Sequence, residues 1–425
     1  MDLFWKVINY FIFLHPLYMS FIWMVGGLLF YFRWERRKYP KQESTSLPFV
    51  SVIVPAHNEE VNINDTISHL DNLNYPHYEV IVVNDGSADK TPQILDDLVK
   101  KYDKWLKVIH LSPNSGKAKA VNVGILLSKG QFILVVDADS FLDKDALNCM
   151  IPHFLAYPRV GAVTGNPRVI NRTTLLGKIQ VGEYSSIIGL IKRSQRLLGK
   201  ILTVSGVIAA FRKSALCDCG LFDPDTVTED IDITWKLQKN FWDIRYEPRA
   251  LCWIYVPETI KGFWRQRVRW AQGGIEVLKK HFSVWSNKKQ RRLWPVYVEY
   301  LVGVLWAYTF AFLIVSWFVI YFARYFFGDG VFAAPAPFIP VIPRWTGSVL
   351  ALVCLIQIMI SLFIDFHYEN RSLLRYYFWA IWYPFFYWMI SAASVIVGVY
   401  NVFIRRSGGV SVTWESPDRG LQTLK

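Results

Sequence analysis

Cysteine is scarce in this sequence, with five residues among 425. They are Cys149, Cys217, Cys219, Cys252 and Cys354. No two of them form a CxxC pair, so the sequence shows neither a disulfide framework nor the ligand spacing of a zinc site. We expect the four cysteines outside the apolar stretches to be reduced, small core residues.

Acidic residues are also in deficit, since 34 Asp and Glu face 47 Lys and Arg, for a net charge of +13. The basic residues cluster beside apolar stretches, as in residues 33–38, and no nucleic-acid-binding motif accompanies them. The charge therefore predicts contact with anionic lipid headgroups and an anionic substrate, and no nucleic-acid partner.

Charge is nearly absent from four long stretches, which are Phe4 to Phe32, Trp294 to Phe327, Trp345 to Ile364 and Tyr376 to Ile404. Each reaches the roughly 20 residues that a helix needs to cross a bilayer, which predicts an integral membrane protein. The first is too long for a signal-peptide core and has no small-residue cleavage site, so we expect a retained span. The basic cluster after it predicts that residues 33 to about 290 face the cytoplasm.

These features predict six regions. They are an N-terminal transmembrane helix (1–32), a basic juxtamembrane linker (33–48), a cytoplasmic domain (49–257), interfacial amphipathic helices (258–293), a transmembrane region of about three apolar segments (294–404) and a C-terminal tail (405–425). Three spans after a cytoplasmic domain would place Arg405 and Arg406 outside, against the positive-inside rule. Either the last stretch, which contains Pro384, lies in the interface, or one stretch folds as a hairpin.

Short β-branched runs alternate with helical patterns between residues 49 and 165. Runs such as FVSVIVPA, YEVIVVND and FILVV read as strands, and residues 59–73, 89–102, 117–128 and 143–156 read as helices. This alternation predicts an α/β fold with a mostly parallel sheet and helices on both faces. Ligands of such sheets bind beyond the carboxyl ends of the strands, so we looked there for functional residues.

Carboxylates follow two of these predicted strands. Asp85 precedes Gly86-Ser87, so it reads either as a turn with a helix cap or as a ligand-binding residue at the crevice. Asp137 and Asp139 form a DxD at the end of an apolar strand, where two carboxylates can hold a hard divalent ion that also binds phosphate oxygens. A solvated loop is the alternative for this pair.

Thr228-Glu229-Asp230 precedes the helical pattern IDITWKLQK. Thr228 as an N-cap, followed by acidic residues at the positive end of the helix, explains these residue types. Asp230 is alternatively a general base that takes a proton from an attacking hydroxyl. Local sequence leaves both interpretations open.

The segment RQRVRWAQGG, residues 265–274, reads first as a basic-aromatic membrane anchor. On a helix, however, Gln266, Arg269, Trp270 and Gly273 share one narrow face, opposite Trp264, Val268, Ala271 and Ile275. The apolar face suits the membrane interface, whereas Arg269 offers a planar fork for diphosphate and Trp270 a flat surface for a sugar ring. An anchor alone accounts for Trp264 and Arg267 but not for the polar face.

Together, Asp85, Asp137-x-Asp139, Thr228-Glu229-Asp230 and Gln266-x-x-Arg269-Trp270 resemble the D, DxD, TED, QxxRW pattern of processive family-2 glycosyltransferases such as cellulose, chitin and hyaluronan synthases. The strings AVTGNPRV, TVSGVIAAFRKSAL and VTEDIDITWKLQ are more similar to bacterial poly-β-1,6-N-acetyl-D-glucosamine synthases. The resemblance covers nearly the whole chain. It implies a GT-A type, Rossmann-like cytoplasmic domain fused to transmembrane and interfacial helices.

The resemblance also implies roles for individual residues. Asp85 would contact the uridine of UDP-N-acetylglucosamine, Asp137 and Asp139 would hold the nucleotide and a Mg²⁺ or Mn²⁺ ion, and Asp230 would be the catalytic base. Gln266 and Trp270 would bind the growing chain, and Arg269 the diphosphate. The product would be β-1,6-linked poly-N-acetylglucosamine, a biofilm polysaccharide exported as it grows. Alternatives are a synthase of the chitin or hyaluronan type, a non-processive transferase and a non-enzymatic export scaffold.

Members of this family are bacterial inner-membrane proteins with a small membrane accessory subunit, and Gram-negative members respond to cyclic di-GMP. Lys192, Arg193 and Arg196 form the basic cluster that would suit an anionic regulator. A solvated or lipid-facing basic helix is the simpler interpretation of the same three residues.

Overall fold

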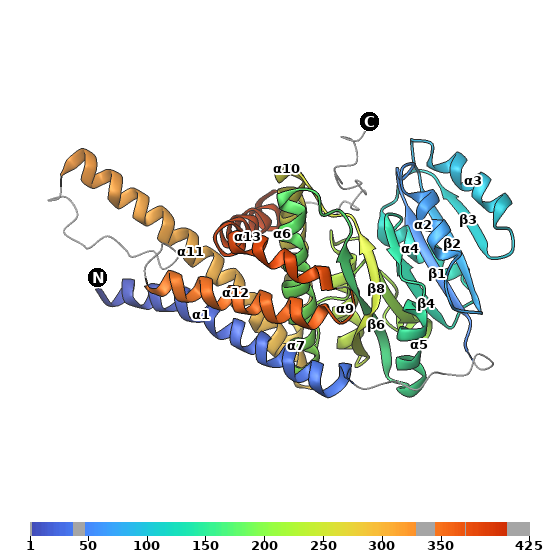
Figure 1. The fold of residues 1–425 in the computed structure, drawn as a ribbon, viewed down its shortest axis with the longest axis horizontal. Coiled ribbons are helices and arrows are strands. Elements are labelled where there is room, and N and C mark those ends of the chain that lie inside the picture. Colours follow the sequence, from blue (N-terminus) through green and yellow to red (C-terminus); the bar gives the residue numbers. More distant parts are fainter. Residues whose placement is uncertain (1, 37–46, 329–344, 370, 406–425) are drawn as a thin grey trace.

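The structure is a computed structural model that describes residues 2–36, 47–328, 345–369 and 371–405. Most of the predicted linker (33–48) and of the predicted tail (405–425) therefore lies outside the described residues. In Figure 1 a twisted sheet flanked by helices forms one end of the molecule, and long helices project from the other.

The described residues contain one eight-stranded sheet, in the order β3-β2-β1-β4-β7-β6-β8-β5. Its strands are β1 (Val50–Ala56), β2 (Tyr78–Asp85), β3 (Leu106–Leu111), β4 (Phe132–Val136), β5 (Ser140–Leu142), β6 (Val160–Val169), β7 (Ile208–Arg212) and β8 (Asp243–Ile254). β1 to β4 pair in parallel, as predicted. The sheet is mixed beyond them, because β7 runs antiparallel to both β4 and β6, and β5 to β8. The predicted alternation ends after β6, where several helical segments intervene before β7 begins.

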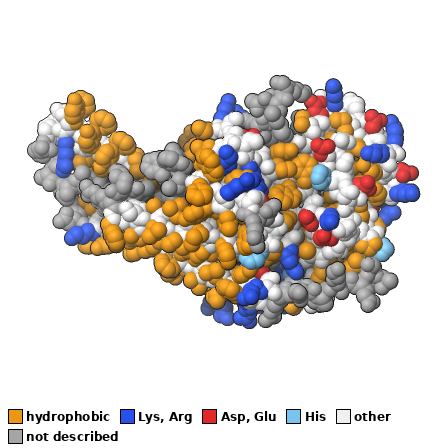
Figure 2. Space-filling view, viewed as in Figure 1, with side chains coloured by type: hydrophobic (Ala, Val, Ile, Leu, Met, Phe, Trp, Pro, Cys, Tyr) orange, Lys and Arg blue, Asp and Glu red, His pale blue; other side chains and the backbone are white. Residues whose placement is uncertain are grey.

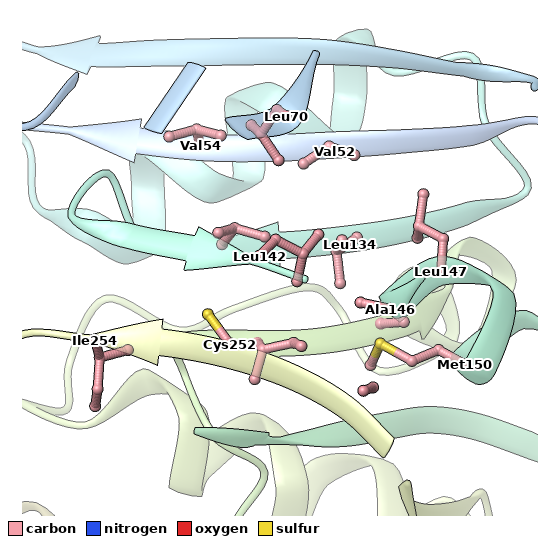
Figure 3. Close-up of a cluster of buried hydrophobic side chains, with 14 of the residues drawn as sticks. Val52, Val54, Leu70, Leu134, Leu142, Ala146, Leu147, Met150, Cys252 and Ile254 are labelled. Carbon is pink, nitrogen blue, oxygen red and sulfur yellow. The ribbon is translucent and has the colours of Figure 1, made fainter. Parts of the chain in front are cut away.

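Helices cover both faces of the sheet, which explains the unbroken apolar runs of β1, β2 and β4. The helices of this domain are α2 (Ile63–Leu70), α3 (Thr91–Lys101), α4 (Lys117–Leu127), α5 (Ala146–Ala156), α6 (Leu175–Glu183), α7 (Ile191–Leu198), α8 (Lys213–Asp218) and α9 (Glu229–Lys239). Figure 3 shows part of one core, to which Val52 and Leu134 of the sheet and Leu147 and Met150 of α5 belong. Ile53 points to the opposite face and joins a second core with α4 and α9.

Three described helices are long and apolar enough to cross a membrane, judged by length and composition. They cover Leu3–Glu35, Lys288–Phe327 and Trp345–Asp365 and correspond to α1 (Asp2–Phe30), α11 (Trp294–Phe327) and α12 (Trp345–Asp365). α1 continues through Pro16. Figure 2 shows hydrophobic side chains over much of this end of the molecule, whereas most charged side chains lie over the sheet end.

The last predicted stretch does not form a single long helix. Residues Arg371–Trp382 are 3₁₀-helical, and α13 (Tyr383–Tyr400) follows and packs against α10 (Ile260–Lys280). The approach is close, because a Cβ on Gly398 would lie 2.9 Å from the backbone nitrogen of Gln272. This last stretch is therefore not among the three described helices that are long and apolar enough to cross a membrane, and its place in the interface stays a prediction.

Buried ion pairs connect the catalytic domain to α1 and α12. Arg193 of α7 donates to Glu35 at 2.6 Å and to Asp365 of α12 at 2.9 Å, and Arg168 of β6 donates to Asp365 at 2.5 Å. Arg193 is fully buried, and Lys192 is 5% exposed. The prediction that Lys192, Arg193 and Arg196 form an accessible basic cluster is therefore wrong, and so is the solvated or lipid-facing alternative for the first two. The reason is that Glu35 and Asp365, which are distant in sequence, neutralise the charge of Arg193.

Candidate active site

One cavity of about 820 Å³ extends from the ends of the sheet strands to the membrane helices. Its wall contains eight of the nine residues singled out in the motifs, namely Asp137, Asp139, Thr228, Glu229, Asp230, Gln266, Arg269 and Trp270. Residues more than 100 positions apart in the chain thus meet at one site, as the position of the motifs at strand and helix ends predicted.

Asp85 is the predicted residue that does not line this cavity. Its carboxylate is fully buried and accepts hydrogen bonds from Ser115 N at 2.9 Å, Ser115 Oγ at 2.8 Å and Gly116 N at 2.8 Å. Gly116 has a φ of +93° and directly precedes α4. Asp85 therefore holds the loop that begins α4. This role is close to the turn-and-cap alternative predicted for Asp85, except that the capped helix is α4 and not the helix that follows Asp85 in the sequence.

Lys117, the first residue of α4, lies between two of the motif carboxylates. Its Nζ is 2.7 Å from Asp137 Oδ1 and 2.9 Å from Glu229 Oε1. Burial and the charge of Asp139 raise the pKa of Asp137, although Lys117 opposes them. For Glu229 burial is the largest single effect and raises the pKa, but the charge and hydrogen bond of Lys117, a backbone hydrogen bond and the charge of Arg269 together lower it. Lys117 is not among the residues predicted from the sequence, because its only local signal is a lysine after a glycine at a helix start.

Asp230 lies in the first turn of α9 and lines the cavity. Ile231 N donates to its Oδ1 at 2.9 Å, and Gly206 N donates to its Oδ2 at 3.2 Å. Burial and the neighbouring Glu229 raise the pKa of Asp230 to about 6, against the charges of Lys117 and Lys192. Thr228 is the N-cap residue, but its side chain makes no capping bond, so capping does not explain these residues.

Lys192 is a second cation of this site that the sequence analysis did not assign to it. Its Nζ donates to Ser205 Oγ at 2.5 Å and to Thr164 Oγ1 at 3.5 Å. Burial lowers the pKa of Lys192 to about 7, although Asp230 opposes the shift. Lys192 therefore places a titratable amine near the carboxylate of Asp230.

Helix α10 carries the QxxRW residues along the cavity. The helix begins at Ile260, where Thr259 Oγ1 accepts a capping bond from Gly262 N at 3.0 Å. Gln266, Arg269 and Trp270 line the cavity together, and Gly273 packs on Thr228 of the α9 N-terminus. The polar face therefore meets the catalytic domain.

The membrane-anchor interpretation of α10 is only partly right. Arg267 is 5% exposed and pairs with Glu183 at 2.8 Å, so it is not a lipid-facing anchor. Ala271 and Ile275, expected on the interfacial face, are buried within the protein. A carboxylate from α6 and the packing of α13 cover positions that looked like an anchor in the sequence.

Another carboxylate group lies outside the predicted motifs. Oxygens of Asp223, Asp225 and Asp232 lie within 4.8 Å of one another, in the part of the chain that the structure describes. Lys280 Nζ is 2.6, 2.8 and 3.0 Å from these three residues, respectively. Lys280 thus contacts all three carboxylates, Lys236 also pairs with Asp223 at 2.6 Å, and the predicted DxD does not contribute to this group.

Comparisons with known proteins show to which family the chain belongs. The family model described as Glycosyl transferase family 2 matches residues 51–220. The chain is 40% identical to a poly-beta-1,6-N-acetyl-D-glucosamine synthase of Staphylococcus epidermidis, over 97% of this chain and 98% of that protein. It is also 40% identical to the synthase of the same name from Staphylococcus aureus strain COL, over 96% and 98%.

The fold is similar to that of a mannosyltransferase from Pyrobaculum calidifontis, solved in complex with GDP-Man and Mn²⁺. The TM-score is 0.61 at 19% sequence identity, over 93% of this chain and all of the other. This likeness supports the GT-A fold, and the relatives above, with the motif residues, specify the family. The chain is a family-2 glycosyltransferase and belongs to the poly-β-1,6-N-acetyl-D-glucosamine synthase family.

Proposed function

We propose that this protein transfers N-acetylglucosamine from UDP-N-acetylglucosamine to the end of a growing β-1,6-linked chain and passes that chain across the membrane. The observation that carries the proposal is the single cavity, which joins Asp230 and Trp270 to side chains of α1, α11, α12 and α13. A transferase acting on a soluble acceptor has no need for a site continuous with membrane helices.

We assign donor binding to the strand-end side of the cavity. Asp137 and Asp139 supply oxygen ligands of the kind that hard divalent ions prefer, and one lysine, Lys117, neutralises this group only in part. These residues thus fit a Mg²⁺ or Mn²⁺ ion, with Asp139 the main ligand, and such an ion would neutralise charge on the departing UDP. Arg269 would contact the diphosphate. Asp85 would act at the uridine through the Ser115–Gly116 loop.

Asp230 is the proposed general base. Its carboxylate accepts the proton of the acceptor hydroxyl as that oxygen attacks the anomeric carbon from the face opposite UDP. An α-linked donor then yields a β-linked product in one displacement, with no covalent sugar–enzyme intermediate. Gln266 and Trp270 would hold the terminal sugar of the chain, because a flat indole suits the apolar face of a pyranose ring.

The membrane half of the cavity supports a route for a hydrophilic polymer. Its wall includes polar side chains from four helices, namely His15, Ser20, Glu299, Gln357, Ser391 and Ser394. Ionisable residues inside membrane helices are costly and commonly line substrate paths. We accordingly propose a bacterial inner membrane location, with the catalytic domain in the cytoplasm and the product moving outward.

Two partners rest on the family resemblance. We propose a small membrane accessory subunit, since relatives of this family work with one. Cyclic di-GMP stays a proposal without a site, because Lys192 and Arg193 are buried and Arg193 is neutralised.

The test is incorporation of radiolabel from UDP-N-acetylglucosamine into polymer by membranes that carry the full chain. We expect labelled polymer that a β-1,6-specific hexosaminidase releases, and a loss of at least about a hundredfold in rate with Asp230→Asn, the scale of a missing general base. Polymer that yields to chitinase instead would keep the mechanism but give a different product. No label incorporation from any UDP-sugar would favour the export scaffold.

A further inference from the structure

Three side chains form a stack along one face of α10. The guanidinium carbon of Arg267 lies 4.3 Å from the ring centroid of Phe263 and 4.3 Å from that of Trp270. Their spacings of four and three residues place them on neighbouring turns of the helix. Arg267 therefore packs between the two rings, at distances typical of cation–π contacts.

Glu183, the last residue of α6, completes this arrangement. Its Oε2 accepts a hydrogen bond from Arg267 Nη2 at 2.8 Å, and the two residues are 2% and 5% exposed. A buried guanidinium is costly without a counter-charge, so Glu183 is what allows Arg267 to remain within the stack. Burial raises the pKa of Glu183, and the charge of Arg267 opposes that shift. The pair also connects α10 to α6.

Trp270 is the member of the stack proposed to bind the growing chain, and its side chain is half-buried in the cavity wall. Arg267 lies over the indole ring, and Trp270 also lines the cavity, where a sugar can stack on it if the plane of the ring is held in place. If the ring were free to rotate, binding of a sugar would have to order the ring, and the lost side-chain entropy would weaken the binding.

We propose that Arg267 and Glu183 are positioning residues that fix the plane of Trp270 for the acceptor end of the polysaccharide. The inference has a structural part, that the pair fixes the plane of the Trp270 ring, and a kinetic part, that this plane favours binding of the acceptor. Only the kinetic part rests on the proposed function. Arg267 is only 5% exposed, which argues against a lipid-binding role, and its guanidinium is engaged by Glu183 and the two rings.

The structural part is tested by ¹⁹F NMR of the full-length protein labelled with 5-fluorotryptophan in lipid nanodiscs. Trp270→Phe identifies the Trp270 resonance by its loss. We expect Arg267→Met and Glu183→Gln to shift or broaden this resonance, while Arg265→Met, an exposed arginine two residues earlier, leaves it unchanged. A Trp270 resonance with the same position and width in Arg267→Met would overturn the inference, whether or not the protein makes polymer.

The kinetic part compares wild type with Arg267→Lys, which keeps a cation beside Glu183 but removes the planar group between the rings. With a β-1,6-linked N-acetylglucosamine oligosaccharide as acceptor, we expect the acceptor KM to rise about tenfold, which corresponds to about 1.4 kcal/mol. The KM for UDP-N-acetylglucosamine should stay the same, and the polymers should become shorter.

The outcomes separate the two proposals. An unchanged acceptor KM, or an equal rise in the KM of donor and acceptor, would show that Arg267 has a general structural role only. Absence of label incorporation by the wild type would contradict the proposed function instead, and the NMR result would then decide the positioning of Trp270 on its own.

Discussion

At the scale of single residues, opposing charges set the protonation of Asp230. Burial, and then the negative charge of Glu229, favour the protonated acid, while Lys117 and Lys192 favour the carboxylate. Lys117 contacts Asp137 and Glu229 directly, so its charge is shared among several carboxylates. Lys192 instead contacts the hydroxyls of Ser205 and Thr164. Lys192 is therefore the more suitable residue for altering the charge around Asp230 without disturbing the DxD residues.

The pKa of Asp230, raised to about 6, predicts the acid side of the pH profile. A base must be ionised to accept a proton, so kcat/KM should rise with pH through about 6 and level off above it. Because the charge of Lys192 lowers the pKa of Asp230, Lys192→Met should move this rise to higher pH, whereas Lys192→Arg should not. Initial rates of label incorporation from pH 5 to 8 measure both. A rise at the same pH in wild type and Lys192→Met would exclude the coupling.

At the scale of secondary-structure elements, α10 lies between the N-terminus of α9 and helix α13. Gly273 permits the contact with α9, because a Cβ at this position would lie 2.7 Å from the Cβ of Thr228. Gly398 permits the contact with α13 on the other side, near Gln272. Asn401 also donates to Gln272 at 3.1 Å. The orientation of the QxxRW residues thus depends on close packing against two elements.

Gly273→Ala should therefore displace α10 from α9. We expect a loss of about 1–3 kcal/mol in stability, the usual cost of overpacking, together with a fall in polymer synthesis because Arg269 and Trp270 move relative to Asp230. Thermal unfolding of the purified protein and label incorporation measure the two effects. The matched control is the double variant Gly273→Ala, Thr228→Gly, which removes the obstructing side chain and should recover most of the stability. Equal stability of the single and double variants would rule out this contact as the cause.

At the scale of the whole molecule, buried ion pairs attach the catalytic domain to the membrane helices. Arg193 reaches Glu35 after α1 and Asp365 at the end of α12, while Arg168 contacts Asp365 and Glu369. All of these side chains are at most 4% exposed. Such a network holds the cavity together across its two halves, since α1 and α12 both contribute to its membrane part.

Arg193→Met should leave Glu35 buried with one positive partner removed. We expect a loss of about 3–5 kcal/mol in stability, as for other broken buried pairs. Arg196→Met, one turn later, is the control, because Arg196 is 3.6 Å from a partly exposed Asp243 and should contribute at most about 1 kcal/mol. Thermal unfolding in detergent compares the two variants. Similar unfolding temperatures would mean that the network does not hold the domain in place.

The sequence by itself determined the features that local patterns encode. Apolar runs bounded by turn residues predicted β1 to β4 and helices α2 to α5, and uninterrupted apolar stretches predicted α1, α11 and α12. The four motifs were recognisable because their residue types and order recur in the family. The antiparallel strands β5 and β7 were not predicted from the sequence. Their direction depends on where the preceding helices place the chain relative to the sheet.

Only the tertiary structure decided the surroundings of the basic residues. Lys192, Arg193 and Arg267 all belong to helical segments in which the sequence indicates solvent, lipid or a regulator as partner. In the structure Arg193 pairs with Glu35 and Asp365, and Arg267 pairs with Glu183, all distant along the chain. Lys192 instead donates to the hydroxyl of Ser205. The cost of burying a charge depends on the position of its counter-charge in space, and that position is set by folding rather than by neighbouring residues.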